Sequence, residues 1–196
     1  MPKHVDHDER RAALAEAVWR LMVDEGLEAV SMRRVASAAG VSLGQVQHYF
    51  ASKDELLMVA LEQLGAQFTR RVAATPAGET PREQVRAFLV QMLPLDEERM
   101  VEAHVGAAFQ ARASVSATFA EVMRGGAVWA TDFLTSRIGE GQRAGQVAAA
   151  RDAGREARIL LALVDGLTAH ALVGHHSPAV AEETLDGYLS DLFDPA

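Results

Sequence analysis

The sequence predicts an all-α protein of about nine helices, in which an N-terminal three-helix unit with a helix-turn-helix precedes a larger helical domain. Three observations support this fold class. Apolar residues recur at intervals of three and four through most of the chain, as one face of an α-helix requires. Residues that favour helix starts and helix ends separate these periodic segments. No alternating segment is long enough to form a useful strand.

The composition excludes several classes of protein. Hydrophobic residues make up 49% of the chain, which is enough to bury a sizeable core. The absence of cysteine excludes disulfides and thiolate metal sites, and it fits a reducing compartment, so we expect a cytoplasmic protein. The first residues lack the apolar centre of a signal peptide. No uninterrupted apolar run reaches the ~18 residues of a membrane span, so we expect no membrane partner.

The first two helices are predicted from an apolar stripe and from the residues that flank it. The stripe begins after a polar start near Asp8, and Gly26 ends the helix because glycine tolerates the left-handed conformation beyond a helix C-terminus. Ser31 is placed to cap a short second helix, which Gly40 stops. The stripe consists of Leu14, Ala17, Val18, Leu21 and Met22.

The third and fourth helices begin with the same signal. Ser42 is an N-cap candidate with Gln45 three residues later, which is the spacing of a capping box. Ser52 and Glu55 repeat this pattern and open a fourth helix over 53–74. The apolar stripe of the fourth helix consists of Leu57, Leu61, Leu64 and Phe68.

A boundary between two functional units is predicted at Ala73–Gly78. We expect residues 1–53 to form one domain and residues 75–196 another, with the fourth helix linking them. Thr80, Pro81 and Glu83 then supply an N-cap, a first-turn proline and a capping-box glutamate. We expect Gly125-Gly126 to bend or interrupt a helix, and residues 139–147 to form a loop. The helices expected in this half cover about 81–93, 97–112, 115–138, 152–174 and 178–193.

The charge is unevenly distributed along the chain. The net charge is −8, which by itself argues against a nucleic-acid partner. Residues 1–74 hold nine Lys/Arg and ten Asp/Glu, whereas residues 75–196 hold ten and seventeen. The window 31–53 contains Arg33, Arg34 and Lys53 and no acidic residue. Such a window can bind phosphate, although a chance gap between acidic residues is the alternative.

The segment 31–57 carries the functional signal. Two short helices meet at the tight turn Ala39-Gly40-Val41-Ser42, and their core can be formed by Val35, Val41, Val46 and Phe50. The front of the second helix then faces outward, and in a helix-turn-helix this part enters the major groove of DNA. A glutamine there can pair with adenine, and a leucine can touch a thymine methyl group. The outward residues are Leu43, Gly44, Gln45, Gln47 and His48.

The segment resembles the DNA-binding domain of the TetR family over about residues 8–60. The matching positions are Val35-Ala36, Ala39-Gly40-Val41-Ser42, Gly44, Val46, Tyr49-Phe50, Lys53 and Leu56. The resemblance implies that Ser31, Arg33, Tyr49 and Lys53 hold phosphates, with Ser42 as a further candidate. Phosphate contacts fix the register on DNA, and base contacts specify the sequence. Gln47 stands where the family usually has tyrosine. Ser31 and Ser42 are helix caps in either case, Tyr49 could be only core, and Lys53 only surface.

The C-terminal helices predict a homodimer. The segment 156–174 is apolar around most of its circumference, so it must be covered on several sides. We expect a second copy to cover one side, with help from Leu185, Leu189 and Leu192 and with Gly166 permitting close approach. TetR relatives dimerise through their last two helices, and this half also loosely resembles the betaine-pathway repressors. A monomer with a central helix is the alternative.

Aromatic, methionine and histidine residues of this half are candidates for a ligand pocket. Methionine and aromatic side chains suit an adaptable apolar pocket, and a histidine can orient a polar group; ordinary core is the alternative for each. His175-His176 invites a metal interpretation, but no carboxylate stands at a matching helical spacing, so we expect no metal and no cofactor. The candidates are Phe88, Met92, Met100, His104, Phe109, Met123, Trp129, Phe133 and His170.

These observations predict a ligand-responsive transcriptional regulator rather than an enzyme. The chain has no glycine-rich phosphate loop, zinc-protease motif or nucleophile elbow. We expect a repressor that binds double-stranded operator DNA and that a small-molecule effector releases, with the fourth helix as the lever between the two domains. An activator, a helical interaction or small-molecule-binding protein that never touches DNA, and an enzyme are the alternatives.

Overall fold

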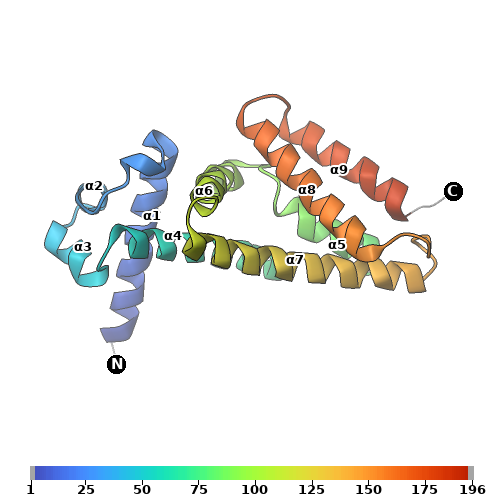
Figure 1. Ribbon diagram of the computed structural model, residues 1–196, viewed down its shortest axis with the longest axis horizontal. Helices are drawn as coiled ribbons and strands as arrows, with labels where there is room; N and C mark the ends of the chain where they lie inside the picture. Colours follow the sequence, from blue (N-terminus) through green and yellow to red (C-terminus); the bar gives the residue numbers. More distant parts are fainter. Residues whose placement is uncertain (1–2, 194–196) are drawn as a thin grey trace. The chain divides into compact units, whose positions relative to one another are not determined.

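The computed structural model describes residues 3–193, with side chains from residue 10 onward (Figure 1). Within these residues the structure contains nine α-helices, one short 3₁₀ helix and no strand, which confirms the all-α prediction. None of the helices in this range has the length and apolar character needed to cross a bilayer. The chain divides into two compact units, each of which is described separately below.

The first unit extends to Gln67 and also includes His104–Phe119 from the middle of the chain. Its core contains buried apolar side chains from its first four α-helices, and the indole N–H of Trp19 donates to the carbonyl of Ala60 over 3.1 Å. These four are α1 (Lys3–Glu25), α2 (Met32–Ala38), α3 (Leu43–Tyr49) and α4 (Lys53–Ala74), and the 3₁₀ helix η1 (Leu27–Ala29) follows α1.

The second unit comprises Phe68–Ala103 and the chain from Ala120. Its core contains buried side chains from α5, α7, α8 and α9, and α9 packs against both α8 and α5 (Figure 1). The helices are α5 (Pro81–Val90), α6 (Glu97–Ala113), α7 (Ala117–Arg143), α8 (Ala153–Leu172) and α9 (Pro178–Phe193). Helices α4, α6 and α7 contribute residues to both units. The boundary predicted near residue 75 separates two functional domains. The two structural units do not test it, so it stays a prediction.

Helix α7 differs from the prediction. It runs without interruption through Gly125-Gly126 and continues to Arg143, so the loop predicted for 139–147 is wrong in its first half. Tertiary packing explains the extension. A Cβ at Gly141 would lie only 2.9 Å from the Phe193 ring and 3.1 Å from the Val147 side chain. Glycine therefore lets α7 approach these residues closely, which offsets its unfavourable helix propensity of about 1 kcal/mol.

The three leucines expected at a subunit interface lie elsewhere. Leu185, Leu189 and Leu192 are completely buried in the core of the second unit of the same protomer. Leu163 of α8 is partly buried against that core. The predicted role of the three α9 leucines in dimerisation is therefore wrong, because α9 directs this stripe at α5 and α8.

Candidate nucleic-acid interface

The turn between α2 and α3 has the backbone that a helix-turn-helix needs. Gly40 adopts φ +67°, a left-handed conformation that glycine reaches without steric cost. The N–H of Val41 donates to the carbonyl of Ala36 over 2.9 Å, which closes the end of α2. At the other end of α2, the hydroxyl of Ser31 accepts from the N–H of Arg34, as the cap prediction requires. Local capping thus fixes both ends of α2.

Helix α3 begins with a complete capping box. The Ser42 hydroxyl accepts from the N–H of Gln45 over 3.2 Å, and the Gln45 amide oxygen accepts from the N–H of Ser42 over 3.1 Å. The side chain of Gln45 is exposed, but its oxygen serves this cap. The sequence placed Gln45 both in the cap and among the base-reading residues. The cap leaves only its amide N–H groups for a base edge.

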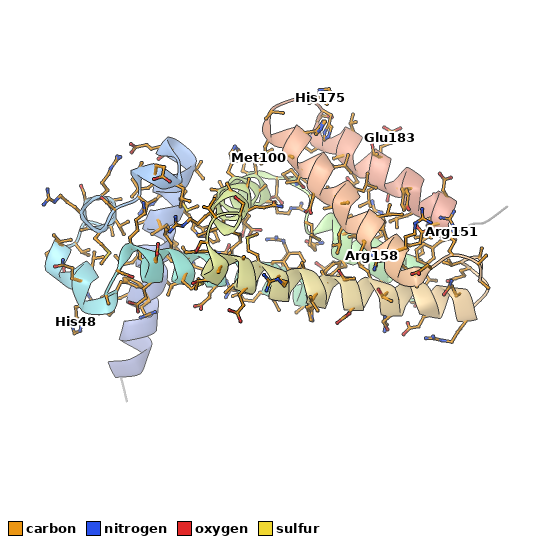
Figure 2. The ribbon with its side chains drawn as sticks, viewed as in Figure 1. His48, Met100, Arg151, Arg158, His175 and Glu183 are labelled. Carbon is orange, nitrogen blue, oxygen red and sulfur yellow. The ribbon has the colours of Figure 1, made fainter. Side chains whose placement is uncertain are left out.

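The outer face of α3 presents the remaining base-reading candidates. Gly44, Gln47 and His48 are exposed, as predicted, and Figure 2 labels His48 on this face. Val46 and Phe50 are buried and hold the opposite face in the core. Leu43 is half-buried. The front of α3 therefore presents the amide of Gln47 and the imidazole of His48, together with Gly44, which has no side chain.

Two of the phosphate candidates already have partners in the protein. The guanidinium of Arg34 forms an exposed ion pair with Glu25. Such pairs contribute only about 0–1 kcal/mol, so a DNA phosphate can compete for Arg34. The ammonium of Lys53 lies 3.5 Å from the carbonyl of Leu27, at the start of α4. Among the described residues Arg33 is exposed and forms no ion pair.

The half-buried Tyr49 is supported by a residue that the sequence analysis missed. The guanidinium of Arg11, on α1, donates to the carbonyl of Tyr49 over 3.1 Å and lies 4.9 Å from the centre of the Phe50 ring. A cation at the C-terminus of a helix interacts favourably with its dipole. Arg11 therefore fixes the end of α3. No local motif reveals this contact, because 38 residues separate the two partners.

Three of the ligand candidates lie together in the second unit. The ring centre of Phe88 lies 4.7 Å from the ring centre of Phe133 and 5.7 Å from that of Trp129. Phe68 of α4, which was expected only as part of an apolar stripe, joins them with a ring separation of 5.5 Å from Phe88. Phe88 is buried, but Trp129 is 49% exposed. We call these four rings the aromatic cluster.

The other candidates are dispersed, so the nine residues do not line one cavity. Phe109 is buried in the first unit, where its ring stacks on Phe119, and the exposed His104 belongs to the same unit. Met92 and Met123 are half-buried. Met100 belongs to a surface pocket of about 480 Å³. That pocket is lined by Pro94, Leu95, Asp96, Glu97, Met100, Val101 and Pro178.

His170 lies in a histidine cluster at the end of α8. Its ring centre is 4.9 Å from that of His175 and 6.0 Å from that of His176. Within the described part of the chain, no group of three or more histidine and acidic side chains is arranged to hold a metal ion.

Two family models match the sequence. Residues 14–59 match the bacterial regulatory proteins of the tetR family, and residues 81–194 match the C-terminal domain of BetI-type transcriptional repressors. Among curated relatives, the transcriptional regulator PksA of Bacillus subtilis is 36% identical over 174 residues, covering 88% of this chain and 83% of the relative. The regulator BetI of Rhizobium meliloti is 36% identical over 168 residues, covering 85% and 80%.

Solved structures show the same similarity. A transcriptional regulator from Rhodococcus sp. Rha1 has a TM-score of 0.84 at 35% identity, covering 93% of this chain and 95% of the other. A transcriptional regulator from Saccharomonospora viridis, solved in complex with choline, has a TM-score of 0.85 at 25% identity, covering 93% and 96%.

Proposed function

Because the chain belongs to the TetR family of transcriptional regulators and carries a BetI-type C-terminal domain, we propose that α3 reads operator DNA and that a small molecule bound in the second unit releases it. The observation that carries this proposal is the exposed front of α3, which lies within the window 31–53 that contains no carboxylate. Repression is the expected outcome of such binding. We place this action in the cytoplasm, because the matching family consists of bacterial regulators, whose DNA lies there.

We divide the DNA contacts into two groups. Ser31, Arg33, Tyr49 and Lys53 are proposed to hold phosphates, with Arg34 and Ser42 as further donors. Gln47 and His48 are proposed to contact base edges, because they are exposed and are not required by a cap. Leu43, Gly44 and the amide N–H groups of Gln45 complete the surface. Backbone at Gly44 can approach DNA closely, since no side chain intervenes.

The outer faces of α8 and α9 support a homodimer. Gly166 and Gly187 stand within these helices, yet apart from the adjacent backbone of the same helix no described atom lies within 4 Å of a Cβ built at either position. Glycine inside a helix costs about 1 kcal/mol relative to alanine, and packing within the protomer gives no reason for it. Val173 and Val180 expose 79% and 44% of their surface beside these helices. We propose that α8 and α9 of a second copy cover these faces at close approach.

The aromatic cluster is the proposed effector site. The half-exposed Trp129 offers the face of its ring to a ligand. The face of an indole ring attracts cations, and an organic cation also brings apolar groups that suit an apolar site. The choline complex of the Saccharomonospora viridis regulator makes quaternary ammonium compounds the first class to test. The guanidinium of Arg137 already lies 5.8 Å from the centre of the Phe133 ring. The effector is therefore expected to use Trp129 and Phe88 rather than Phe133.

Release requires that the effector bind the DNA-incompetent arrangement more tightly, because equal affinity for both arrangements shifts nothing. A coupling free energy of about 1–3 kcal/mol gives about 5–150-fold release. Helix α4 is the proposed lever, since it begins at Lys53 beside α3 and its last residues belong to the second unit. A small tilt of α4 changes the separation of the two reading helices in a dimer.

The test of this function is equilibrium binding to genomic DNA fragments over a range of salt concentrations. We expect the logarithm of the affinity to fall linearly with the logarithm of the salt concentration, because released counterions accompany each phosphate contact. Choline added at fixed salt is then expected to lower the affinity. Binding that is absent at low salt would favour a helical interaction protein. Salt-dependent binding that choline leaves unchanged would retain the regulator and reject choline as its effector.

A further inference from the structure

A buried ion pair joins α4 to α6 in the second unit. The guanidinium of Arg71 donates to both carboxylate oxygens of Glu102, over 2.8 and 2.6 Å. It also donates to the carbonyl of Gln91, just beyond the end of α5, over 3.1 Å. One side chain of α4 therefore holds α6 and the end of α5. We call Arg71, Glu102 and the Gln91 carbonyl the Arg71 clasp.

Burial distinguishes this pair from the other inter-helix pairs of the unit. The side chains of Arg71 and Glu102 are 21% and 9% exposed, whereas those of Arg86 and Asp186, which join α5 to α9, are 40% and 39% exposed. A buried ion pair adds little net stability compared with apolar residues of the same volume, because both charges lose their hydration. What it adds is a defined geometry, since only a planar guanidinium can bind a carboxylate with two parallel hydrogen bonds.

The Arg71 clasp includes a residue of α4, the helix that begins beside the DNA-reading helix, and it lies near the residues of the surface pocket and of the aromatic cluster. Arg71 lies near the far end of the helix that starts at Lys53. Glu102 directly follows the α6 segment containing Met100 and Val101, which line the surface pocket. Phe68, three residues before Arg71 and therefore almost one helical turn away, belongs to the aromatic cluster. A bound molecule that moved either neighbour would disturb the orientation of the clasp.

We propose that the Arg71 clasp is the positioning element that holds α4 in the DNA-competent arrangement, and that the effector releases DNA by opening it. This inference rests on the proposed function. Arg71 and Glu102 touch neither DNA nor effector in this account; they act through α4. Loss of the clasp should therefore imitate the effector without any effector present.

The experiment compares the DNA affinity of three changes with that of a control. Glu102→Gln retains the shape of the side chain but removes its charge, and Arg71→Lys retains the charge but loses the paired geometry. The reversed pair, Arg71→Glu with Glu102→Arg, restores an ion pair. Asp186→Asn makes the same removal of charge in the more exposed pair between α5 and α9 of this unit, where Arg86 also contacts Glu182, and serves as the control. The probe is a DNA fragment enriched by the wild-type protein from its genome, without added small molecule.

We expect Glu102→Gln to lower the affinity by about 5–150-fold, the range of a typical allosteric coupling. Arg71→Lys should give a smaller loss, the reversed pair should recover part of it, and Asp186→Asn should bind like the wild type. Amide hydrogen exchange should remain unchanged over residues 31–50, which shows that the DNA-reading helices are intact. Arg71→Lys keeps the test valid if Glu102→Gln does not fold.

Two results would overturn the inference. One is wild-type affinity in Glu102→Gln and Arg71→Lys, and the other is an equal loss in Asp186→Asn, which would indicate general destabilisation. Failure of the wild-type protein to enrich any DNA would instead contradict the proposed function as a DNA-binding regulator. The clasp proposal would then fail with it.

Discussion

At the scale of single residues, some polar side chains of α3 cap the helix, whereas others are available to contact DNA. The amide oxygen of Gln45 is used by the capping box, whereas Gln47 and His48 are exposed. Lys53 begins α4 and contacts the carbonyl of Leu27 only at 3.5 Å. We therefore assign a general electrostatic role to Lys53 and a sequence-reading role to Gln47.

Lys53→Ala is expected to weaken binding about equally to all DNA sequences and to lower the slope of log affinity against log salt by about one. The reason is the loss of one phosphate contact. Gln47→Ala is the matched change, and it should alter which sequences are preferred while the slope stays the same. Fluorescence anisotropy with enriched and scrambled fragments measures both. An altered sequence preference in Lys53→Ala with an unchanged slope would contradict the assignment.

Tyr188 predicts a pH dependence of stability that is independent of DNA. Its hydroxyl donates to the buried carboxylate of Glu156 over 2.7 Å, and burial together with this bond raises the pKa of Tyr188 to about 12. Because the pKa in the folded state exceeds the unfolded value of about 10, this stabilisation is complete below pH 10 and is lost as the pH rises towards 12.

Tyr188→Phe is expected to reduce the free energy of unfolding at pH 7 by about 1–3 kcal/mol, because the Glu156 carboxylate loses a donor. Urea unfolding at pH 7 and over pH 9.5–11.5 tests this. The wild type should lose more stability than the variant across the alkaline range. Parallel loss in both proteins would show that the Tyr188 hydroxyl does not contribute.

The local residue signals could be predicted from the sequence, and the long-range ones could not. Ser31, Ser42 and Thr80 cap helices as predicted, because an N-cap depends on residues two or three positions away. The pairing of Arg34 with Glu25 and the support of Tyr49 by Arg11 depend on tertiary packing. The spacing of residues along the sequence does not predict such partners.

At the scale of elements, the turn between α2 and α3 was predictable and the end of α7 was not. Gly40 and the capping serine mark the turn within four residues of sequence. By contrast, α7 continues through Gly139 and Gly141 because distant Phe193 packs on it. The scatter of the ligand candidates has the same origin. Composition identified aromatic and methionine residues, but only packing separates Phe109 from the aromatic cluster.

Gly40→Ala is expected to destabilise the protein by about 1–2 kcal/mol, because a Cβ is unfavourable at φ +67°. Gly44→Ala is the control, since Gly44 lies inside α3 with ordinary φ and its Cβ would meet only the Ser42 hydroxyl at 3.9 Å. The control should be neutral or slightly stabilising. Chemical denaturation compares the two. Equal stability of Gly40→Ala and the wild type would mean that the turn does not require a left-handed residue.

At the scale of the whole molecule, the proposed subunit interface keeps the predicted helices and Gly166 but no longer includes the three α9 leucines. Leu189 is buried in its own protomer, so a charge there would unfold the protein and reveal nothing about dimers. Exposed alanine and glycine residues on α8 are the better signal, because they are small and face away from the core. Hydropathy alone could not separate these two faces.

Ala162→Arg is expected to convert a dimer into a folded monomer, because Ala162 is exposed on the α8 face that carries Gly166. A large charged residue there leaves the protomer core intact and blocks close approach of a second copy. Sedimentation at micromolar concentration gives the mass, and circular dichroism checks the fold. Ala74→Arg, at the exposed end of α4, is the control and should remain dimeric. A wild-type monomer, or a dimeric Ala162→Arg, would argue against this interface.

The proposed function depends above all on a dimer that reads DNA with two α3 helices. Selection of genomic DNA fragments by the purified protein, followed by sequencing, tests it most directly. We expect an inverted repeat whose half-sites lie about 10–10.5 base pairs apart, or a multiple of that, since two reading helices must enter major grooves on one side of the duplex. Gln47→Ala should change the half-site while the spacing is retained. Fragments enriched without a shared motif, or a single unrepeated site, would contradict the claim.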